Sequence, residues 1–302
     1  MDPAGVKKII ESIQPPAVRN RLLSTLQLAV NLVPVPQDGK DESAQALPVA
    51  ASKFGGLPDL PPGFAWPLSG LRRKPDFRDG STGYPDYQYH QAPLVFLAQI
   101  NLADTPAGLT SEAAPAWLLP RAGLLSFFAA CYKTGFPDTG CHPGDWLVVY
   151  TPPGQRIAAA QPPVVSAEFA AAAEEDGVEE LDSDTRRMIL PQRAMHLQLT
   201  ATPRWAEMYG SGVAINDDCM HLRHAVLLHV LGGHACHKQA PVEDTAADLP
   251  RNLDEQVVQL LQLDTDHRSG THWCYSARAH FMIKRSALRR LAFDEVVVVS
   301  QI

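Results

Sequence analysis

The sequence predicts an α+β protein, mainly β, in which internally duplicated curled sheets form a pseudo-barrel with peripheral helices and an N-terminal helical pair. Two observations predict this fold. A Gly-Gly turn, an apolar strand with an inner Gln, and an aromatic strand follow one another twice, from Gly55-Gly56 and again from Gly232-Gly233. The 26 prolines and 20 glycines lie mostly between short apolar runs, which is typical of many short strands joined by irregular loops.

The first 32 residues predict two helices. Apolar residues from Val6 to Ile13 recur at helical spacing, and Pro15-Pro16 then interrupts the pattern. A second amphipathic helix is predicted over residues 18–32. We expect residues 1–45 to form a helical segment packed on the body of the protein.

The remaining chain, residues 46–302, is predicted to be the duplicated domain. Repeat one covers about residues 52–152, an insert covers 153–215, and repeat two covers about 216–302. Within the insert, residues 166–188 are rich in Ala and acids and predict two short surface helices. Further helices are predicted over 204–209 and 217–231. The predicted strands are residues 94–101, 123–132, 146–151, 195–203, 257–264, 279–283 and 295–302.

The composition limits the classes of function. A formal charge of −7 disfavours nucleic-acid binding and fits either a partner with a basic surface or ordinary solubility. No apolar run is long enough to span a membrane, and the start of the chain lacks the pattern of a secretory leader. Five irregularly spaced cysteines indicate reduced thiols. We therefore expect a cytoplasmic protein.

Motifs for catalysis are missing from the sequence. It contains no Gly-x-Ser-x-Gly, no Gly-x-Gly-x-x-Gly and no Gly-x-x-x-x-Gly-Lys. A cluster of imidazoles and thiols has two interpretations, a metal site or a set of solvated and hydrogen-bonded side chains. Its spacing lacks Cys-x-x-Cys and His-Glu-x-x-His, so we predict no metal, no cofactor and no catalytic residue. The members are Cys219, His221, His224, His229, His234, Cys236 and His237.

Each repeat carries a polar pair in its apolar strand. Gln99 shares a strand face with Asn101, and Gln262 shares one with Asp264. These side chains are predicted either to bond structural backbone or to line a cleft between the repeats. Asp264 and Asp266 follow a predicted buried strand, where carboxylates either cap a turn, bind a cation or act as a general base. In the cleft interpretation the additional lining residues are His229, Asp266 and Trp273.

Two other segments are candidate contacts for a partner protein. Trp66 lies in a proline-rich segment, where it either anchors an interface or plugs one end of the barrel. The insert carries acids that would complement a basic partner surface. These acids are Glu174, Glu175, Asp176, Glu179 and Glu180.

The order of these motifs resembles the YwqG-like family of bacterial proteins, the domain of unknown function 1963. Gly55-Gly56-Leu57-Pro58-Asp59 and the strand around Gln99 resemble its first half. Gly232-Gly233 and the strand around Gln262 resemble its second half, and the similarity covers about residues 50–302. Two loops depart from the family pattern: His234-Ala235-Cys236 replaces Tyr-Pro-Asp, and Cys274-Tyr275-Ser276-Ala277 follows Trp273.

The resemblance implies a duplicated β fold without an established activity. Family members occur near bacterial toxin and secretion genes, including those of type VI secretion. We therefore expect a non-enzymatic immunity protein that neutralises a cognate toxin by direct binding. The alternative is a small-ligand or metal-dependent enzyme that uses the cleft between the repeats. A structural or regulatory stress protein is a third possibility.

Overall fold

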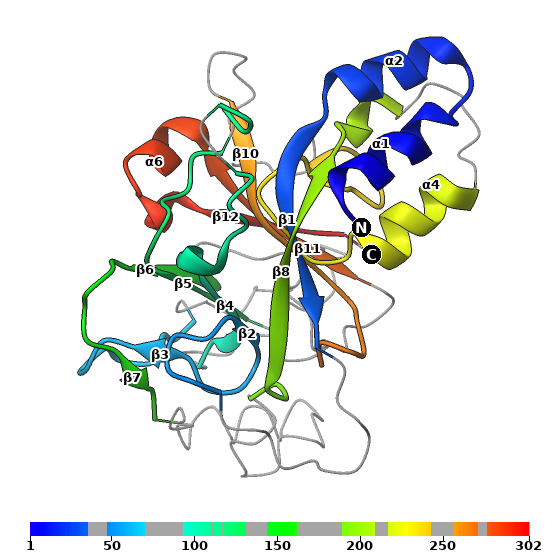
Figure 1. The fold of residues 1–302 in the computed structure, drawn as a ribbon. Coiled ribbons are helices and arrows are strands. Elements are labelled where there is room, and N and C mark those ends of the chain that lie inside the picture. Colours follow the sequence, from blue (N-terminus) through cyan, green and yellow to red (C-terminus); the bar gives the residue numbers. More distant parts are fainter. Residues whose placement is uncertain are drawn as a thin grey trace, which may run out of the picture.

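The described part of the chain is built around one curled antiparallel sheet with short helices outside it (Figure 1). The structure is a computed structural model of the 302-residue chain. It describes residues 1–35, 47–69, 93–109, 112–115, 117–130, 144–161, 189–208, 217–242, 256–270 and 277–301. The predicted helices over 166–188 lie outside the described residues, as do the five acids of the insert and Trp273.

The main sheet has ten strands in the order β12-β11-β10-β9-β1-β8-β2-β4-β5-β6, and all its neighbours are antiparallel. A second sheet pairs β3 (Asp59–Leu60) with β7 (Ala158–Ala159). The strands of the main sheet are β1 (Gln27–Pro34), β2 (Lys53–Phe54), β4 (Val95–Asn101), β5 (Leu124–Ala129), β6 (Trp146–Thr151), β8 (Arg193–Thr202), β9 (Val230–Leu231), β10 (Val257–Asp264), β11 (Arg278–Lys284) and β12 (Val297–Gln301).

The two ends of this sheet curl towards each other, so that it forms a nearly closed barrel. Trp146 on β6 donates its indole N–H to the carbonyl of Val296, just before β12, at 2.6 Å. Tyr150 lies 5.6 Å from Phe293, measured between ring centroids. Inside the barrel, Phe127 meets Phe281 edge-to-face at 5.2 Å. Such aromatic contacts add to the burial of apolar surface, which is the main source of folding free energy.

The short strands β2 and β9 connect the centre of the sheet to its two arms. β2 pairs with β8 and β4, and β9 pairs with β1 and β10. Each short strand runs into a Gly-Gly turn whose residues have φ between 54° and 71°. A Cβ on Gly55 would lie 2.4 Å from a backbone oxygen, and one on Gly233 would lie 2.3 Å from the hydroxyl of Thr202. These turns therefore require glycine.

Helices cover one side of the central pair β1–β8 (Figure 1). They are α1 (Pro3–Glu11), α2 (Pro16–Ser24) and α4 (Asp217–His221), followed by a π-helical turn, Leu222–Val226. Asp2 caps α1 by accepting from the N–H of Gly5 at 2.8 Å. A second apolar core unites Val6, Ile10 and Leu22 with Trp205. The helix α6 (Arg285–Arg289) and the 3₁₀ turns Leu102–Asp104, Trp205–Met208 and Phe293–Glu295 complete the described helical elements.

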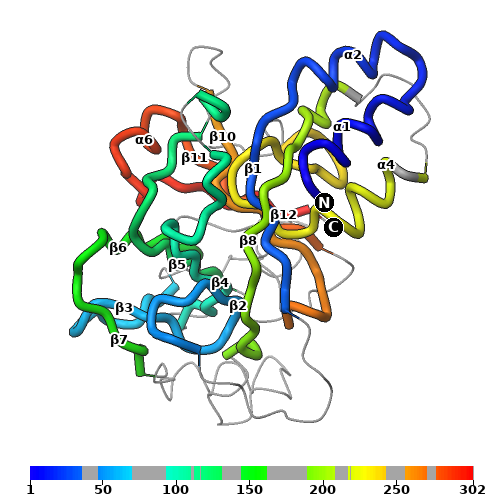
Figure 2. The backbone as a smooth tube through the Cα atoms, viewed as in Figure 1, coloured from blue at the N-terminus to red at the C-terminus, as the bar shows by residue number. Residues whose placement is uncertain are grey.

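Two of the helix predictions are wrong in part. The helix predicted over residues 18–32 ends at Ser24, and Gln27–Pro34 is a strand at the centre of the sheet (Figure 2). Leu28, Val30 and Leu32 fit alternation as well as helical spacing, and eight residue pairs with β8 favour the strand. The helix predicted over 217–231 ends in the π turn, because Val230–Leu231 is the strand β9.

The predicted strands lie close to their expected positions. β6 and β10 have the expected bounds, and β4, β8, β11 and β12 differ by one or two residues at an end. β5 begins one residue after the predicted start and ends at Ala129, and residues 131–132 of that prediction lie outside the described residues. Among the described helices, none is both long and apolar enough to cross a membrane.

Candidate functional site

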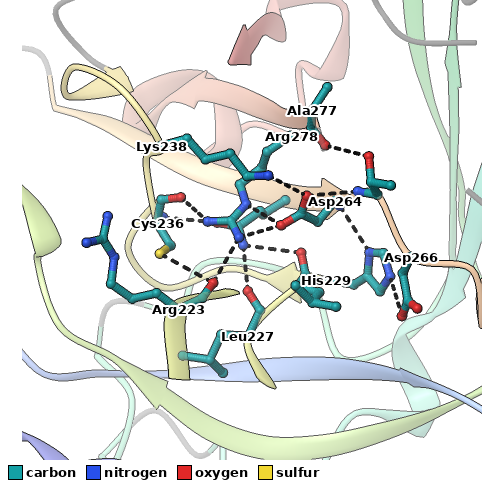
Figure 3. A network of polar contacts seen from close by, with 12 residues as sticks. Arg223, Leu227, His229, Cys236, Lys238, Asp264, Asp266, Ala277 and Arg278 are labelled. Carbon is teal, nitrogen blue, oxygen red and sulfur yellow. Dashed lines mark hydrogen bonds and ion pairs between the residues drawn. The ribbon is translucent and has the colours of Figure 1, made fainter. Parts of the chain in front are cut away.

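A buried ionic network lies where β10 ends and β11 begins, next to the turn that follows the second Gly-Gly pair (Figure 3). Arg278 is its centre and is fully buried. Its guanidinium donates to Asp264 Oδ2 from Nε at 2.8 Å and to the carbonyl of Arg223 from Nη2 at 2.9 Å. It also donates to the carbonyl of Cys236. Every branch of the guanidinium therefore has a protein acceptor.

The carboxylate of Asp264 balances two cations. Arg278 binds one oxygen, and Lys238 Nζ lies 3.1 Å from the other. Burial opposes the charge of Arg278, but the nearby Asp264 carboxylate keeps the pKa of Arg278 raised. Burial lowers the pKa of Lys238, and Asp264 opposes that shift. Removal of one partner would leave a buried charge uncompensated, which is strongly destabilising.

A second arm of the network runs through His229, which is buried. The N–H of Asp264 donates to His229 Nδ1 at 3.2 Å, so the ring hydrogen belongs to Nε2. Nε2 lies 3.4 Å from Asp266 Oδ2. Burial would raise the pKa of Asp266, but contacts with His229 and Arg268 hold it below its usual range. Asp266 is therefore ionised at neutral pH, and its carboxylate contacts both His229 and Arg268.

The two strand glutamines hold the two Gly-Gly turns. Gln99 accepts from the N–H of Asp59 at 2.9 Å and donates to the carbonyl of Ala51 at 2.8 Å and to Asp59 Oδ2 at 2.6 Å. Gln262 accepts from the N–H of Cys236 at 3.0 Å. Its amide donates to the carbonyls of residues 227 and 228 at 2.8 and 3.2 Å. Both side chains are fully buried, so neither lines an open cleft.

Asn101 has a local role at the end of β4. Its side chain accepts from the N–H of Ala103 and caps a 3₁₀ turn, and its own N–H donates to the hydroxyl of Ser52 at 2.9 Å. Asp264 lies at the equivalent place on β10, two residues after Gln262. Unlike Asn101, Asp264 belongs to an ionic network.

The imidazole and thiol cluster is dispersed over several environments. His234 Nε2 bonds the carbonyl of Thr25 at 3.0 Å, and His229 belongs to the network described above. Cys219 and Cys236 are buried in the apolar core beneath the helices. In the part of the chain that the structure describes, no group of three His, Cys, Asp or Glu residues is placed to hold a metal ion.

Trp66 is braced against the body. It is half-buried, its indole N–H donates to the carbonyl of Leu94 at 2.8 Å, and its ring meets Phe128 edge-to-face at 5.9 Å. Its neighbours Phe64 and Leu68 are instead exposed, at 39% and 47%. Trp66 stands out in the sequence as a candidate contact, whereas Phe64 and Leu68 were not predicted to be contacts. Their signal was their position in a proline-rich segment.

Sequence reasoning also missed the cations of both turns. In the first half, Lys53 is buried and pairs with Asp59 at 3.2 Å. In the second, Arg278 lies directly opposite Asp264 in the strand register. For Arg278 the available signal was its opposite charge to Asp264 on the neighbouring strand, but that signal requires knowing which residues face each other.

The chain also matches a known family. The model of the domain of unknown function DUF1963 matches residues 52–301. The chain belongs to this family. A comparison with curated proteins finds no match. The DUF1963 match begins after β1. The matched residues supply all the other strands of the main sheet, and β1 lies at the centre of that sheet.

Proposed function

We propose that this DUF1963 protein is a non-enzymatic binding protein that recognises another protein, and that its partner is a toxin, such as a secreted effector, that it neutralises by direct contact. The observation that carries the proposal is the rigid segment 61–68 with two exposed apolar side chains. The kind of partner follows from the family resemblance, in which such proteins occur beside toxin and secretion genes. A cytoplasmic location belongs to the same proposal.

The segment 61–68 is well suited to binding because it is ordered before a partner arrives. Phe64 donates its N–H to the carbonyl of Pro61 at 3.0 Å, and Leu94 donates to the carbonyl of Pro67 at 2.8 Å. Leu68 forms an isolated β-bridge with Pro93. Apolar residues on a braced backbone bind with a small loss of conformational entropy, because little of the segment has to be ordered on binding.

The buried polar residues support binding over the enzyme alternative. That alternative assigns a cleft to Gln99, Gln262, Asp264, Asp266 and His229. Gln99 and Gln262 are fully buried, and their amides are occupied by the backbone of the two turns. The carboxylate of Asp264 is held between Arg278 and Lys238. Side chains with these contacts stabilise the fold and are poorly placed to reach a substrate.

We also infer that the two arms of the sheet arose by internal duplication. Each arm has a short strand, a Gly-Gly turn and a long strand with a bulge two residues before its Gln, between Phe96 and Ala98 or between Gln259 and Leu261. Comparison of the two halves across many homologous sequences would test this inference. Duplication predicts that the Gly-Gly and Gln positions of the two halves align with each other, with differences in length confined to the segment between the turn and the long strand.

The test of function is protection from the toxin encoded beside this gene. Co-expression should restore growth, and the purified proteins should form a stoichiometric complex. Phe64→Ser and Leu68→Gln should each weaken the complex about tenfold or more, because each removes an apolar anchor. Met220→Gln, a change at an equally exposed apolar residue on α4, should leave binding unchanged. If the toxin kills regardless and no complex forms, the proposal is wrong.

A further inference from the structure

A second surface feature, separate from segment 61–68, is a pocket of about 620 Å³. The start of α1, the start of β1, the end of β8 and the turn at residues 113–115 surround it. Its volume lies in the range of small-molecule sites, roughly 300–1,000 Å³. Leu26, Leu28, Ala114 and Pro115 provide apolar walls.

The charge of the pocket is opposite to that of the chain. Lys7 and Arg204 line it, and the described residues of its lining include no carboxylate, whereas the chain as a whole carries a formal charge of −7. Lys7 lies 3.9 Å from Glu11, and both side chains are exposed, so this ion pair is weak. Among the described residues, no carboxylate forms an ion pair with Arg204. The cations are therefore available to a ligand.

The polar wall of the pocket is fixed by Thr25. Arg204 donates its N–H to the hydroxyl of Thr25 at 3.0 Å, and His234 Nε2 bonds the carbonyl of Thr25 at 3.0 Å. The N–H of His234 donates to the hydroxyl of Thr202 at 2.7 Å. Burial lowers the pKa of His234 to about 4, so the ring is neutral at physiological pH. The positive charge therefore comes from Lys7 and Arg204, which line the pocket together with this preorganised wall.

We propose that this pocket binds a small organic carboxylate with an apolar body. Arg204 and Lys7 receive the carboxylate, because a guanidinium donates two parallel hydrogen bonds to it and an ammonium adds a point charge. The apolar body lies against Leu28 and Pro115. A small molecule fits better than a protein segment because the site is a concave pocket of small-molecule size that carries two cations. The proposal does not depend on the protein-binding function.

The experiment compares three ligands of the same length on the full chain: octanoate, octanamide and octylammonium. Calorimetric titration should give saturable binding of octanoate, with Kd on the order of 1 mM or tighter for a ligand of this size. Octanamide should bind at least about fivefold more weakly, and octylammonium should not bind, because the pocket selects negative charge.

Variants locate the site. Arg204→Gln and Lys7→Gln should each weaken octanoate binding about fivefold or more, while thermal unfolding shows that the fold is kept. Arg156→Gln removes an exposed cation in the turn between β6 and β7 and should leave the Kd unchanged. The proposal is overturned if octanoate does not saturate, if octanamide binds equally well, or if both pocket variants keep the wild-type Kd.

Discussion

The two Gly-Gly turns are held by the same hydrogen bonds and by different charges. Gln99 and Gln262 each accept from the backbone N–H four residues after the first glycine of the pair, and each donates to a carbonyl preceding the turn. The buried pair Lys53–Asp59 has no ionic counterpart at the matching positions Val230 and Cys236.

The second half places its charges at the strand ends instead. Asp264 faces Arg278 in the register, where the first half pairs Asn101 with Leu124. The difference teaches that the Gln-to-backbone bonds define the turn, because a buried N–H requires an acceptor wherever the turn occurs. The ionic groups can differ, because each network needs only to compensate its own charges.

The largest expected effect comes from breaking the second network. Arg278→Met should lower the free energy of unfolding by about 3–5 kcal/mol, because it removes a buried partner of Asp264 and the hydrogen bonds that the guanidinium donates to the carbonyls of Arg223 and Cys236. Urea unfolding measures the loss. Leu124→Met, at the same register position in the first half, should cost less than about 1.5 kcal/mol. Equal losses would contradict the comparison.

Acid should weaken the second turn more than the first, because His234 occupies the position of Leu57. Burial lowers the pKa of His234 to about 4 from 6.5. Between these values the unfolded chain binds a proton that the folded protein does not, so stability falls as the pH falls through this window. The loss is about 2–3 kcal/mol by pH 4.

Unfolding measured from pH 7 to pH 4 tests this effect. His234→Leu introduces the residue of the first turn and should flatten the pH dependence by that amount. His196→Leu, at an exposed position on β8, should retain the wild-type slope. A His234→Leu protein that keeps the full acid sensitivity would disprove the assignment.

The two glutamines should have comparable effects of intermediate size. Gln99→Leu and Gln262→Leu each leave a buried backbone N–H without an acceptor, which costs about 1–3 kcal/mol. Gln99→Leu should cost more, because Gln99 also donates to the buried Asp59 carboxylate. Chemical unfolding measures both, and Gln198→Leu at an exposed site is the control. If Gln262→Leu left the free energy of unfolding unchanged, the second turn would not need the Gln262 hydrogen bonds for its stability.

The smallest expected effect comes from giving the first turn the residues of the second. Lys53→Val alone should cost about 3 kcal/mol, because it leaves Asp59 buried without its cation. Lys53→Val combined with Asp59→Cys removes both charges and should cost less, about 1–2 kcal/mol, because Ala50 and Gln99 still lose the carboxylate as an acceptor. A double-mutant cycle measures the coupling, and a double variant less stable than Lys53→Val would contradict this view.

Part of the candidate site could be predicted from the sequence. Gln99, Gln262 and Asp264 stood out as polar residues in apolar strands, and burial of an amide implies hydrogen-bond partners. The partners themselves could not be predicted, because they are backbone groups of turns far along the chain. Arg278 was missed because a charged residue at a strand end normally faces solvent, and only its register opposite Asp264 makes it central.

The sequence by itself determined the strands β4, β6 and β10 and the Gly-Gly turns, because alternation, apolar runs and left-handed φ are local properties of neighbouring residues. Only the tertiary structure decided that Gln27–Pro34 is a strand. Its local pattern also fits a helix, and the long antiparallel pairing with β8 favours the extended form. Contacts between residues distant in the chain likewise close the barrel through Trp146 and create the Arg278 network.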